Sequence, residues 1–291
     1  MTKLHRVSLQ VPRRAVDTFW QALEPDCLSV ATFEDAKDDT LWLIEGVASE
    51  APDLDPLKAR LILAAELSGC ATPPVTVEPL PDRDWLQHIY ALLKPIHVGR
   101  FFIHGSHYTG CMPAGARALR IDAATAFGSG EHETTRACLI ALNGLIKQGL
   151  RPARVLDMGC GSGILGLAAA AHWRCPVDAI DIDPESVRMT RLNARRNHLA
   201  PYLRAQTGDG YNTPLARQGR PYDLIFANIL ARPLIRMAPS LKTALRPGGT
   251  AILSGLLDRQ EAAVMAAHRT AGLRLVRRVS VGAWRGLVIR R

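Results

Sequence analysis

A glycine-rich bend between two predicted elements constrains this chain more than any other feature. Residues 155–158 form an apolar run that includes Asp157, glycines occupy positions 159, 161 and 163, and an alanine-rich helical pattern follows. Alternate glycines let a strand turn sharply into a helix and leave the backbone open to a ligand. A second apolar run ends in Asp181, where a carboxylate can hold ribose hydroxyls. The sequence therefore predicts a site for a nucleoside-containing cofactor that includes Gly159, Gly161 and Asp181.

From about residue 115 onward, predicted strands alternate with predicted helices. We expect strands at 154–156, 177–180, 202–205, 224–227 and 250–253, and helices at 134–149, 163–171, 184–197, 232–245 and 258–271. This alternation indicates an α/β fold, a doubly wound parallel sheet covered on both faces. Two consecutive β-rich segments, 273–281 and 287–290, end the chain and predict a terminal antiparallel hairpin near Gly282.

The N-terminal part shows a different order of elements. The patterns predict strands at 5–11, 28–33, 41–47 and 75–80 and helices at 13–24 and 56–67, with a polar turn at 34–40. The order β-α-β-β-α-β favours a small α+β, ferredoxin-like domain over residues 1–81. We expect residues 82–114 to form a linker, with a helix at 84–94 and a β-rich lead-in at 95–108, and residues 115–291 to form the cofactor-binding domain.

Composition restricts the class of protein and its surroundings. No apolar stretch approaches the length of a membrane span, and six scattered cysteines form no Cys-x-x-Cys motif. Residues 1–10 contain no apolar core before a cleavage site, so we expect no secretory signal. We therefore expect a cytoplasmic protein without a membrane partner, a disulfide framework or a metal site. The net charge of +9 favours acidic partners such as nucleic acid, although an arginine-rich surface also serves solubility. The same two readings apply to the helical face that carries Arg188, Arg191, Arg195 and Arg196, and no basic strand interleaved with aromatic residues is apparent.

The identity of the cofactor depends on the surroundings of the glycines. Residues 161–166 match the dinucleotide pattern G-x-G-x-x-G, which is weak evidence on its own and also fits a packing role. Asp157 would repel a pyrophosphate, yet it could hold the cationic amino group of a methionine moiety. Asn228 follows the fourth strand of the unit, where methyl-transfer enzymes place cofactor and substrate contacts. A turn at 245–249 and the terminal strand pair complete a pattern that favours S-adenosylmethionine over NAD.

Several motifs together resemble one family. Residues 126–135 read Ala-Phe-Gly-Ser-Gly-Glu-His-Glu-Thr-Thr. The blocks that follow are residues 157–165, Asp181-Ile-Asp183-Pro184, Asn193-Ala, Asn228-Ile-Leu-Ala and Leu253-Ser-Gly255. In this order they resemble the bacterial methyltransferases that modify ribosomal protein L11. Ser129 stands where that family usually has Thr, and Ala124-Thr125 also departs slightly from it.

The resemblance implies a class I methyltransferase that uses S-adenosylmethionine. It implies cofactor contacts by Thr135, Gly159, Asp181 and Asn228, to which the residues themselves add Gly161 and Asp157. Candidates for the catalytic step are Asn228 and His132, with Glu133 beside it. Each has a structural alternative: a helix-interior hydroxyl for Thr135, helix capping for His132 and Glu133, and a turn for Asn228. Asp209 fits either the adenine region or a plain turn.

The resemblance also implies the reaction and the partner. The substrates would be lysine side chains and the N-terminal amine of ribosomal protein L11, free or in the large ribosomal subunit, with possible proximity to rRNA. The small N-terminal domain would grip the substrate protein, and we expect a monomer. Two alternatives stay open: another class I methyltransferase acting on RNA or a small molecule, and a dinucleotide-binding oxidoreductase or a binding module without catalysis.

Overall fold

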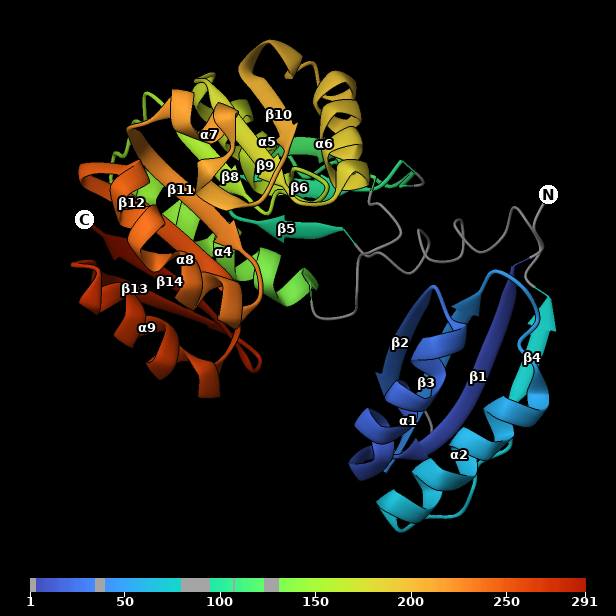
Figure 1. The fold of residues 1–291 in the computed structure, drawn as a ribbon. Helices are drawn as coiled ribbons and strands as arrows, with labels where there is room; N and C mark the ends of the chain where they lie inside the picture. Colours follow the sequence, from blue (N-terminus) through green and yellow to red (C-terminus); the bar gives the residue numbers. More distant parts are fainter. Residues whose placement is uncertain (1–3, 35–39, 80–94, 107, 123–130) are drawn as a thin grey trace. The chain divides into compact units, whose positions relative to one another are not determined.

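The computed structural model describes residues 4–34, 40–79, 95–106, 108–122 and 131–291, and the chain divides into two compact units, residues 1–92 and 93–291 (Figure 1). The helix expected at 84–94, most of the turn expected at 34–40, and residues 126–130 of the signature segment lie outside the described residues. None of the described helices is long and apolar enough to cross a membrane.

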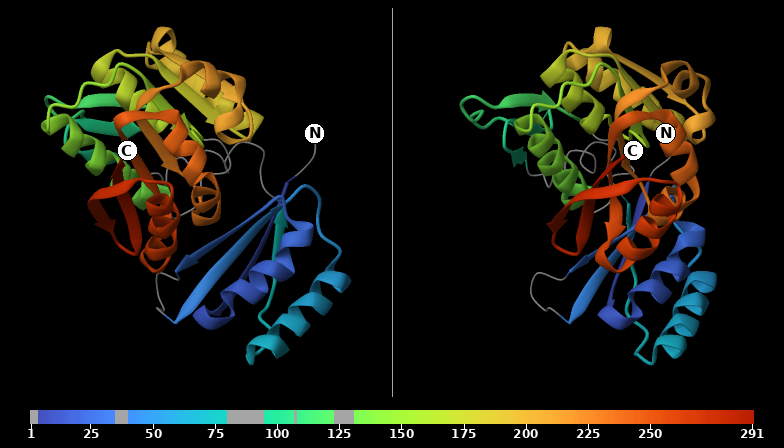
Figure 2. Two further views of the ribbon diagram at one scale, coloured as in Figure 1. Left: turned by 60° about the vertical axis from the view of Figure 1, so that its left-hand side comes forward. Right: turned by 90° about the vertical axis from the view of Figure 1, so that its left-hand side faces the viewer.

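The N-terminal unit is an antiparallel sheet with two helices packed on one of its faces (Figure 2). The sheet order is β2-β3-β1-β4, and each neighbouring pair is antiparallel. This order confirms the predicted ferredoxin-like fold. Its elements are β1 (His5–Pro12), α1 (Val16–Leu23), β2 (Ser29–Glu34), β3 (Leu41–Ala48), α2 (Leu54–Ser68) and β4 (Thr76–Pro79).

The alternating pattern of β1 explains how this unit is held together. Val7, Leu9 and Val11 project to one face of the strand because side chains alternate across a sheet. All three are buried with Phe19 from α1 and Leu57 from α2 in one apolar cluster. The helices therefore cover the face that the period-two pattern makes apolar.

The C-terminal unit contains a seven-stranded sheet of order β10-β9-β8-β11-β12-β14-β13. The first five strands are parallel, and β14 pairs antiparallel with both β12 and β13. This topology confirms the predicted doubly wound sheet with a terminal hairpin. Its strands are β8 (Val155–Met158), β9 (Val177–Asp181), β10 (Leu203–Thr207), β11 (Tyr222–Asn228), β12 (Leu245–Leu257), β13 (Arg274–Val281) and β14 (Trp284–Arg290).

Helices cover both faces of this sheet and form two separate apolar clusters. One cluster holds buried residues of α4 (Glu131–Lys147), α5 (Ile164–Trp173) and α6 (Pro184–Arg196). The other holds residues of α7 (Pro214–Gly219), α8 (Ala231–Ala244) and α9 (Glu261–Thr270). Successive residues of the central strands join opposite clusters: Leu224 and Phe226 the first, Ile225 and Ala227 the second. A strand buried on both faces is apolar throughout, which is why these runs lack polar alternation.

Two parts of this unit differ from the expectations. The β-rich lead-in forms β5 (Ile96–Val98) and β6 (Phe101–His104), but an unexpected strand, β7 (Arg117–Arg120), pairs with β6. Of its four residues only Leu119 is buried, so β7 carries too short an apolar signal to be read from the sequence. The turn expected at 245–249 is instead the start of β12, where residues between Leu245 and Thr250 bulge out opposite β11. Pro247 supplies no backbone N–H and Gly248 has φ +75°, so the turn signal produces a bulge within the strand.

Candidate functional site

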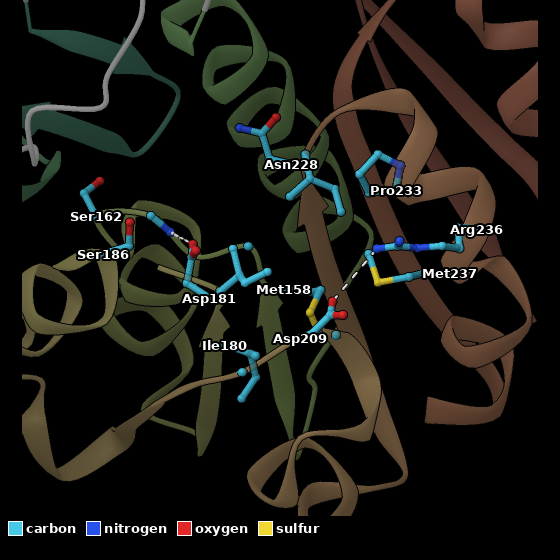
Figure 3. A pocket seen from close by; sticks show the side chains of 16 residues that line it. Met158, Ser162, Ile180, Asp181, Ser186, Asp209, Asn228, Pro233, Arg236 and Met237 are labelled. Carbon is cyan, nitrogen blue, oxygen red and sulfur yellow. Dashed lines mark hydrogen bonds and ion pairs between the residues drawn. The ribbon is translucent and has the colours of Figure 1, made fainter. Parts of the chain in front are cut away.

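A cavity of about 340 Å³ opens at the carboxyl ends of β8, β9, β10 and β11 (Figure 3). The helix after β8 packs in one apolar cluster and the helix after β11 packs in the other, so the cavity lies where the winding of the sheet reverses. Open α/β sheets bind ligands at this position. The lining residues are Met158, Gly159, Gly161, Ser162, Ile180, Asp181, Ile182, Ser186, Gly208, Asp209, Gly210, Asn228, Ile229, Pro233, Arg236 and Met237.

The glycine bend forms the floor of this cavity. Gly159, Gly161 and Gly163 have φ values of +70°, +54° and +84°, a left-handed conformation that side chains with a Cβ disfavour. At Gly159 space is also decisive, because a Cβ would lie 2.2 Å from Cγ2 of Ile229. At Gly161 a Cβ would meet nothing within 4 Å, so this backbone faces open space.

Side chains from α6 hold the bend in place. The Thr190 hydroxyl donates a hydrogen bond to the Gly161 carbonyl at 2.8 Å, and the Asn193 amide donates to the Ser162 carbonyl at 3.0 Å. Asn193 is fully buried and also exchanges hydrogen bonds with the backbone N–H and carbonyl of Asp122. The bend is therefore braced by protein groups on the side away from the cavity.

Asp181 ends β9 with its carboxylate at the cavity wall. One carboxylate oxygen accepts a hydrogen bond from the Gly161 N–H at 2.8 Å, and the other accepts from the Asp183 N–H at 3.0 Å. These bonds fix the orientation of the carboxylate, and each oxygen keeps a lone pair for a further donor. The position matches the one that the sequence predicts for a group that accepts ribose hydroxyls.

Asn228 ends β11 and also lines the cavity. Its Nδ2 donates to the hydroxyl of Thr134 at 3.3 Å. Its Oδ1 is buried and finds no hydrogen-bond donor among the described residues. A buried acceptor without a donor is costly, so this oxygen is suited to receive a donor from a bound molecule.

Asp157 is not at the cavity wall. The residue is only 2% exposed, and its carboxyl group accepts a hydrogen bond from the Gly166 N–H, in the first turn of α5, at 2.7 Å. Burial raises the pKa of this carboxyl to about 7, against the opposing effect of the Gly166 hydrogen bond. In the structure this group therefore braces the start of α5.

Three further predicted residues, His132, Glu133 and Thr135, belong to α4. Thr135 is buried and is not part of the cavity wall. Glu133 lies beside Gly282 of the terminal hairpin, likewise away from the wall. The side chain of His132 lies outside the described residues. From the predicted set, the structure brings together Gly159, Gly161, Asp181, Asn228 and Asp209 at the cavity.

The wall formed by α8 was not expected from the sequence. Pro233, Arg236 and Met237 line the cavity from this helix, opposite Asp181 (Figure 3). Arg236 forms an ion pair with Asp209 at 3.9 Å, and both side chains are 72% exposed, so solvent screens their attraction. Asp209 is thus a lining residue as well as part of a turn. Among the described residues, no group of three His, Cys, Asp or Glu could hold a metal ion.

Comparison with known proteins gives a consistent result. The family model described as "Ribosomal protein L11 methyltransferase (PrmA)" matches residues 5–291. The chain belongs to this family.

Individual relatives belong to the same family. A ribosomal protein L11 methyltransferase of Rhodopseudomonas palustris is 37% identical over 95% of this chain and 92% of its own length. One from Brucella suis is 46% identical over 67% of this chain and 68% of its own length. The crystal structure of a ribosomal protein L11 methylase from Lactobacillus delbrueckii subsp. bulgaricus superposes with a TM-score of 0.60 and 28% identity, over 68% of this chain and 98% of that one.

Membership of the L11 methyltransferase family covers both units, since the match begins in β1 and ends at the last residue. Two bracing residues were missed by the sequence reasoning. Thr190 gave no signal, because a hydroxyl inside a helical pattern has no obvious partner. Asn193 carried a signal, since it stood in a block shared with the L11 methyltransferases, but its contacts to residues 31 and 71 positions away are visible only in the fold.

Proposed function

We propose that this protein is an S-adenosylmethionine-dependent methyltransferase that methylates lysine side chains and the N-terminal amine of ribosomal protein L11. The observation that carries the proposal is the cavity. It combines an oriented carboxylate, an open glycine backbone and an amide oxygen that has no donor in the described part of the chain, at the switch point of a methyltransferase-type sheet. The relatives, which are ribosomal protein L11 methyltransferases, supply the substrate.

The cavity wall fits the parts of S-adenosylmethionine. Asp181 has lone pairs left for two ribose hydroxyls, as a cis-diol requires. Ile182 is 71% exposed beside it, and Met158 and Met237 add apolar surface, which suits an adenine ring. The backbone at Gly159 and Gly161 leaves room for the methionine part.

The revised position of Asp157 changes its proposed role. A carboxyl that braces α5 beneath the bend does not touch the cofactor, and a group with a pKa of about 7 is only partly charged at neutral pH. We propose that Asp157 and Thr135 support the cavity from behind. His132, whose side chain lies outside the described residues, stays a candidate for the catalytic step.

The chemistry requires a neutral amine aligned with the transferable group. Bound S-adenosylmethionine supplies a methyl group on a positively charged sulfur. Asn228 Oδ1 can accept a hydrogen bond from an N–H of the attacking amine, which turns the lone pair of the amine nitrogen toward the methyl carbon. Alignment of this kind lowers the barrier substantially. Deprotonation of a lysine with pKa ~10.4 costs about 4 kcal/mol at pH 7.5, whereas an α-amine with pKa ~8 costs well under 1 kcal/mol. An N-terminal amine is therefore the easier substrate.

The two units carry net charges of opposite sign, which supports separate roles for them. Residues 1–92 contain 8 Lys and Arg against 15 Asp and Glu, whereas residues 93–291 contain 28 against 12. An acidic unit favours association with a basic protein, and proteins of the ribosome that contact RNA are expected to be basic. We propose that the ferredoxin-like unit, over residues 1–81, binds the substrate protein.

Incorporation of label tests this function. The enzyme is incubated with methyl-labelled S-adenosylmethionine and purified L11, with rRNA and a small-molecule amine in parallel reactions. Label on L11, mapped by mass spectrometry to lysines and the N-terminus, is the expected result. Label on RNA only would contradict it and favour a different class I methyltransferase. A shift in melting temperature with NAD but not with S-adenosylmethionine would indicate a dinucleotide-binding protein instead.

A further inference from the structure

Four arginines gather at the edge of the sheet opposite the cavity. Arg151 and Arg174 stand a few residues before β8 and β9 begin, so they lie at the amino ends of these parallel strands, whereas the cavity lies at the carboxyl ends. Arg117 starts β7; its backbone N–H donates to the Arg100 carbonyl at 2.6 Å, and its guanidinium donates to the Ala171 carbonyl at 3.1 Å. We call Arg100, Arg117, Arg151 and Arg174 the basic edge.

The electrostatics at His172 show that this cluster lacks compensation. The pKa of His172 is lowered by burial and then by the charges of Arg100, Arg117 and Arg151. No carboxylate is among these influences, and none within the described residues forms an ion pair with any arginine of the basic edge. The positive potential at this edge is therefore open to an external anion.

Aromatic rings lie among these guanidinium groups. Arg174 stacks over the Tyr202 ring at 5.3 Å. The His172 and Trp173 rings meet edge to face at 5.2 Å, and Trp173 Nε1 donates to the Leu150 carbonyl at 3.0 Å. All three rings are half-buried, so each keeps exposed surface. Flat cations together with partly exposed rings suit a polymer that offers both phosphates and bases.

Capping of helix ends explains only part of the cluster. Arg117 satisfies one carbonyl in the last turn of α5, a favourable place for a cation. Arg151, however, makes no side-chain hydrogen bond or ion pair with the described residues, and neither does the guanidinium of Arg174, which stacks over the Tyr202 ring. Trp173 and Tyr202 pack in part against the apolar cluster of this unit, and the exposed remainder of each ring can stack on a base. An acidic protein partner would use the charges alone, which favours RNA.

We propose that the basic edge binds the phosphate backbone of an RNA, on the side of the catalytic unit opposite the methyl-transfer cavity. Through this surface the enzyme could stay on a ribonucleoprotein while the cavity remains accessible. The proposal does not depend on which amine is methylated.

Fluorescence anisotropy with the full chain and a fluorescein-labelled RNA hairpin tests it. The test variant combines Arg117→Gln, Arg151→Gln and Arg174→Gln. The matched control combines Arg217→Gln, Arg259→Gln and Arg269→Gln, three exposed arginines on α7, before α9 and on α9, and loses the same charge. Melting temperature and S-adenosylmethionine binding confirm that both variants are folded.

We expect the test variant to bind the hairpin at least tenfold more weakly and the control to lose about twofold or less. The slope of log K against log salt should become shallower by about 2 in the test variant, since each lost phosphate contact removes about 0.7–0.9. Equal losses in both variants, or no binding by the unmodified protein at low salt, would overturn the proposal. Equally tight binding of poly-glutamate would also overturn it, because the surface would then suit an acidic protein.

Discussion

Gly159 lies directly against the side chain of Ile229, so close that a Cβ at position 159 would stand 2.2 Å from Ile229 Cγ2. The glycine bend after β8 and the segment after β11 therefore form one packed surface. Gly159 meets two constraints at once, a left-handed φ of +70° and this close approach. The two can be separated by experiment.

Gly159→Ala should cost both stability and cofactor affinity, whereas Gly149→Ala should cost stability alone. Gly149 has a similar φ of +84°, but a Cβ there would meet nothing within 4 Å. We expect Gly149→Ala to lose about 1–2 kcal/mol of unfolding free energy, and Gly159→Ala to lose more and to bind S-adenosylmethionine at least tenfold more weakly. Urea unfolding and calorimetric titration measure the two effects. Equal effects of both variants would show that the Ile229 side chain moves away from the new methyl group at little energetic cost.

Asp181→Asn should weaken cofactor binding at least tenfold. The NH2 of the new amide would face either a backbone N–H that now donates to Asp181 or the ribose, so one acceptor of the site is lost. Hydrogen bonds to a charged acceptor contribute about 1.5–3 kcal/mol each. Asp183→Asn is the control, since it removes the same charge two residues away while Asn still caps α6. Isothermal titration with S-adenosylmethionine decides; unchanged affinity in Asp181→Asn would place the ribose elsewhere.

Asn228→Ala should lower kcat on L11 by about a hundredfold, the cost of misplacing a reacting group by about 1 Å. The affinity for S-adenosylmethionine should change far less, because the buried Oδ1 is proposed to face the amine. Asn143→Ala, which removes an amide paired with Arg100 at 3.2 Å, is the control. Single-turnover rates and titrations separate the two quantities. A loss of cofactor affinity as large as the loss of rate would place Asn228 against the cofactor instead.

Asp157→Asn should leave cofactor affinity almost unchanged and should alter the pH dependence of stability. The folded-state pKa of about 7 lies above the usual 3.8, so between these values the folded protein binds more protons than the unfolded chain. The contribution of Asp157 is therefore most favourable below pH 3.8 and is lost as the pH rises to about 7. Across this window the free energy of unfolding of the variant should rise relative to that of the unmodified protein, by at most about 4 kcal/mol. Urea unfolding at several pH values measures this difference. A large drop in cofactor affinity would restore a direct contact with the cofactor.

Much of the fold could be predicted because its signals are local. Alternation in β1, continuous apolar runs in the parallel strands, and glycines at the bends each fix one element, and the order of elements then limits the topology. β7 was not predicted, because Leu119 is the only buried residue in it. The start of β12 was predicted as a turn, because Pro247 and Gly248 are typical of one. Only the pairing of β12 with β11 shows that they form a bulge.

The candidate site was predictable where a residue follows directly from a strand end, as Asp181 and Asn228 do. Asp157 was placed wrongly in relation to the cavity, because the strand end alone does not reveal that its carboxyl turns toward the Gly166 N–H. Arg236 and Met237 depend on which face α8 presents to the sheet. The basic edge draws its arginines from four separate segments, so no window of the sequence could display it.

The brace from α6 bears on how the enzyme works through successive rounds. In the proposed reaction each transfer consumes one cofactor molecule, so an enzyme that methylates several amines must release the spent thioether and refill the cavity every time. With Thr190 and Asn193 clamping the bend, the emptied floor has no need to refold before the next molecule arrives. Exchange should then be limited by diffusion and escape, and the conformational cost of ordering that floor is met only once, when the chain folds.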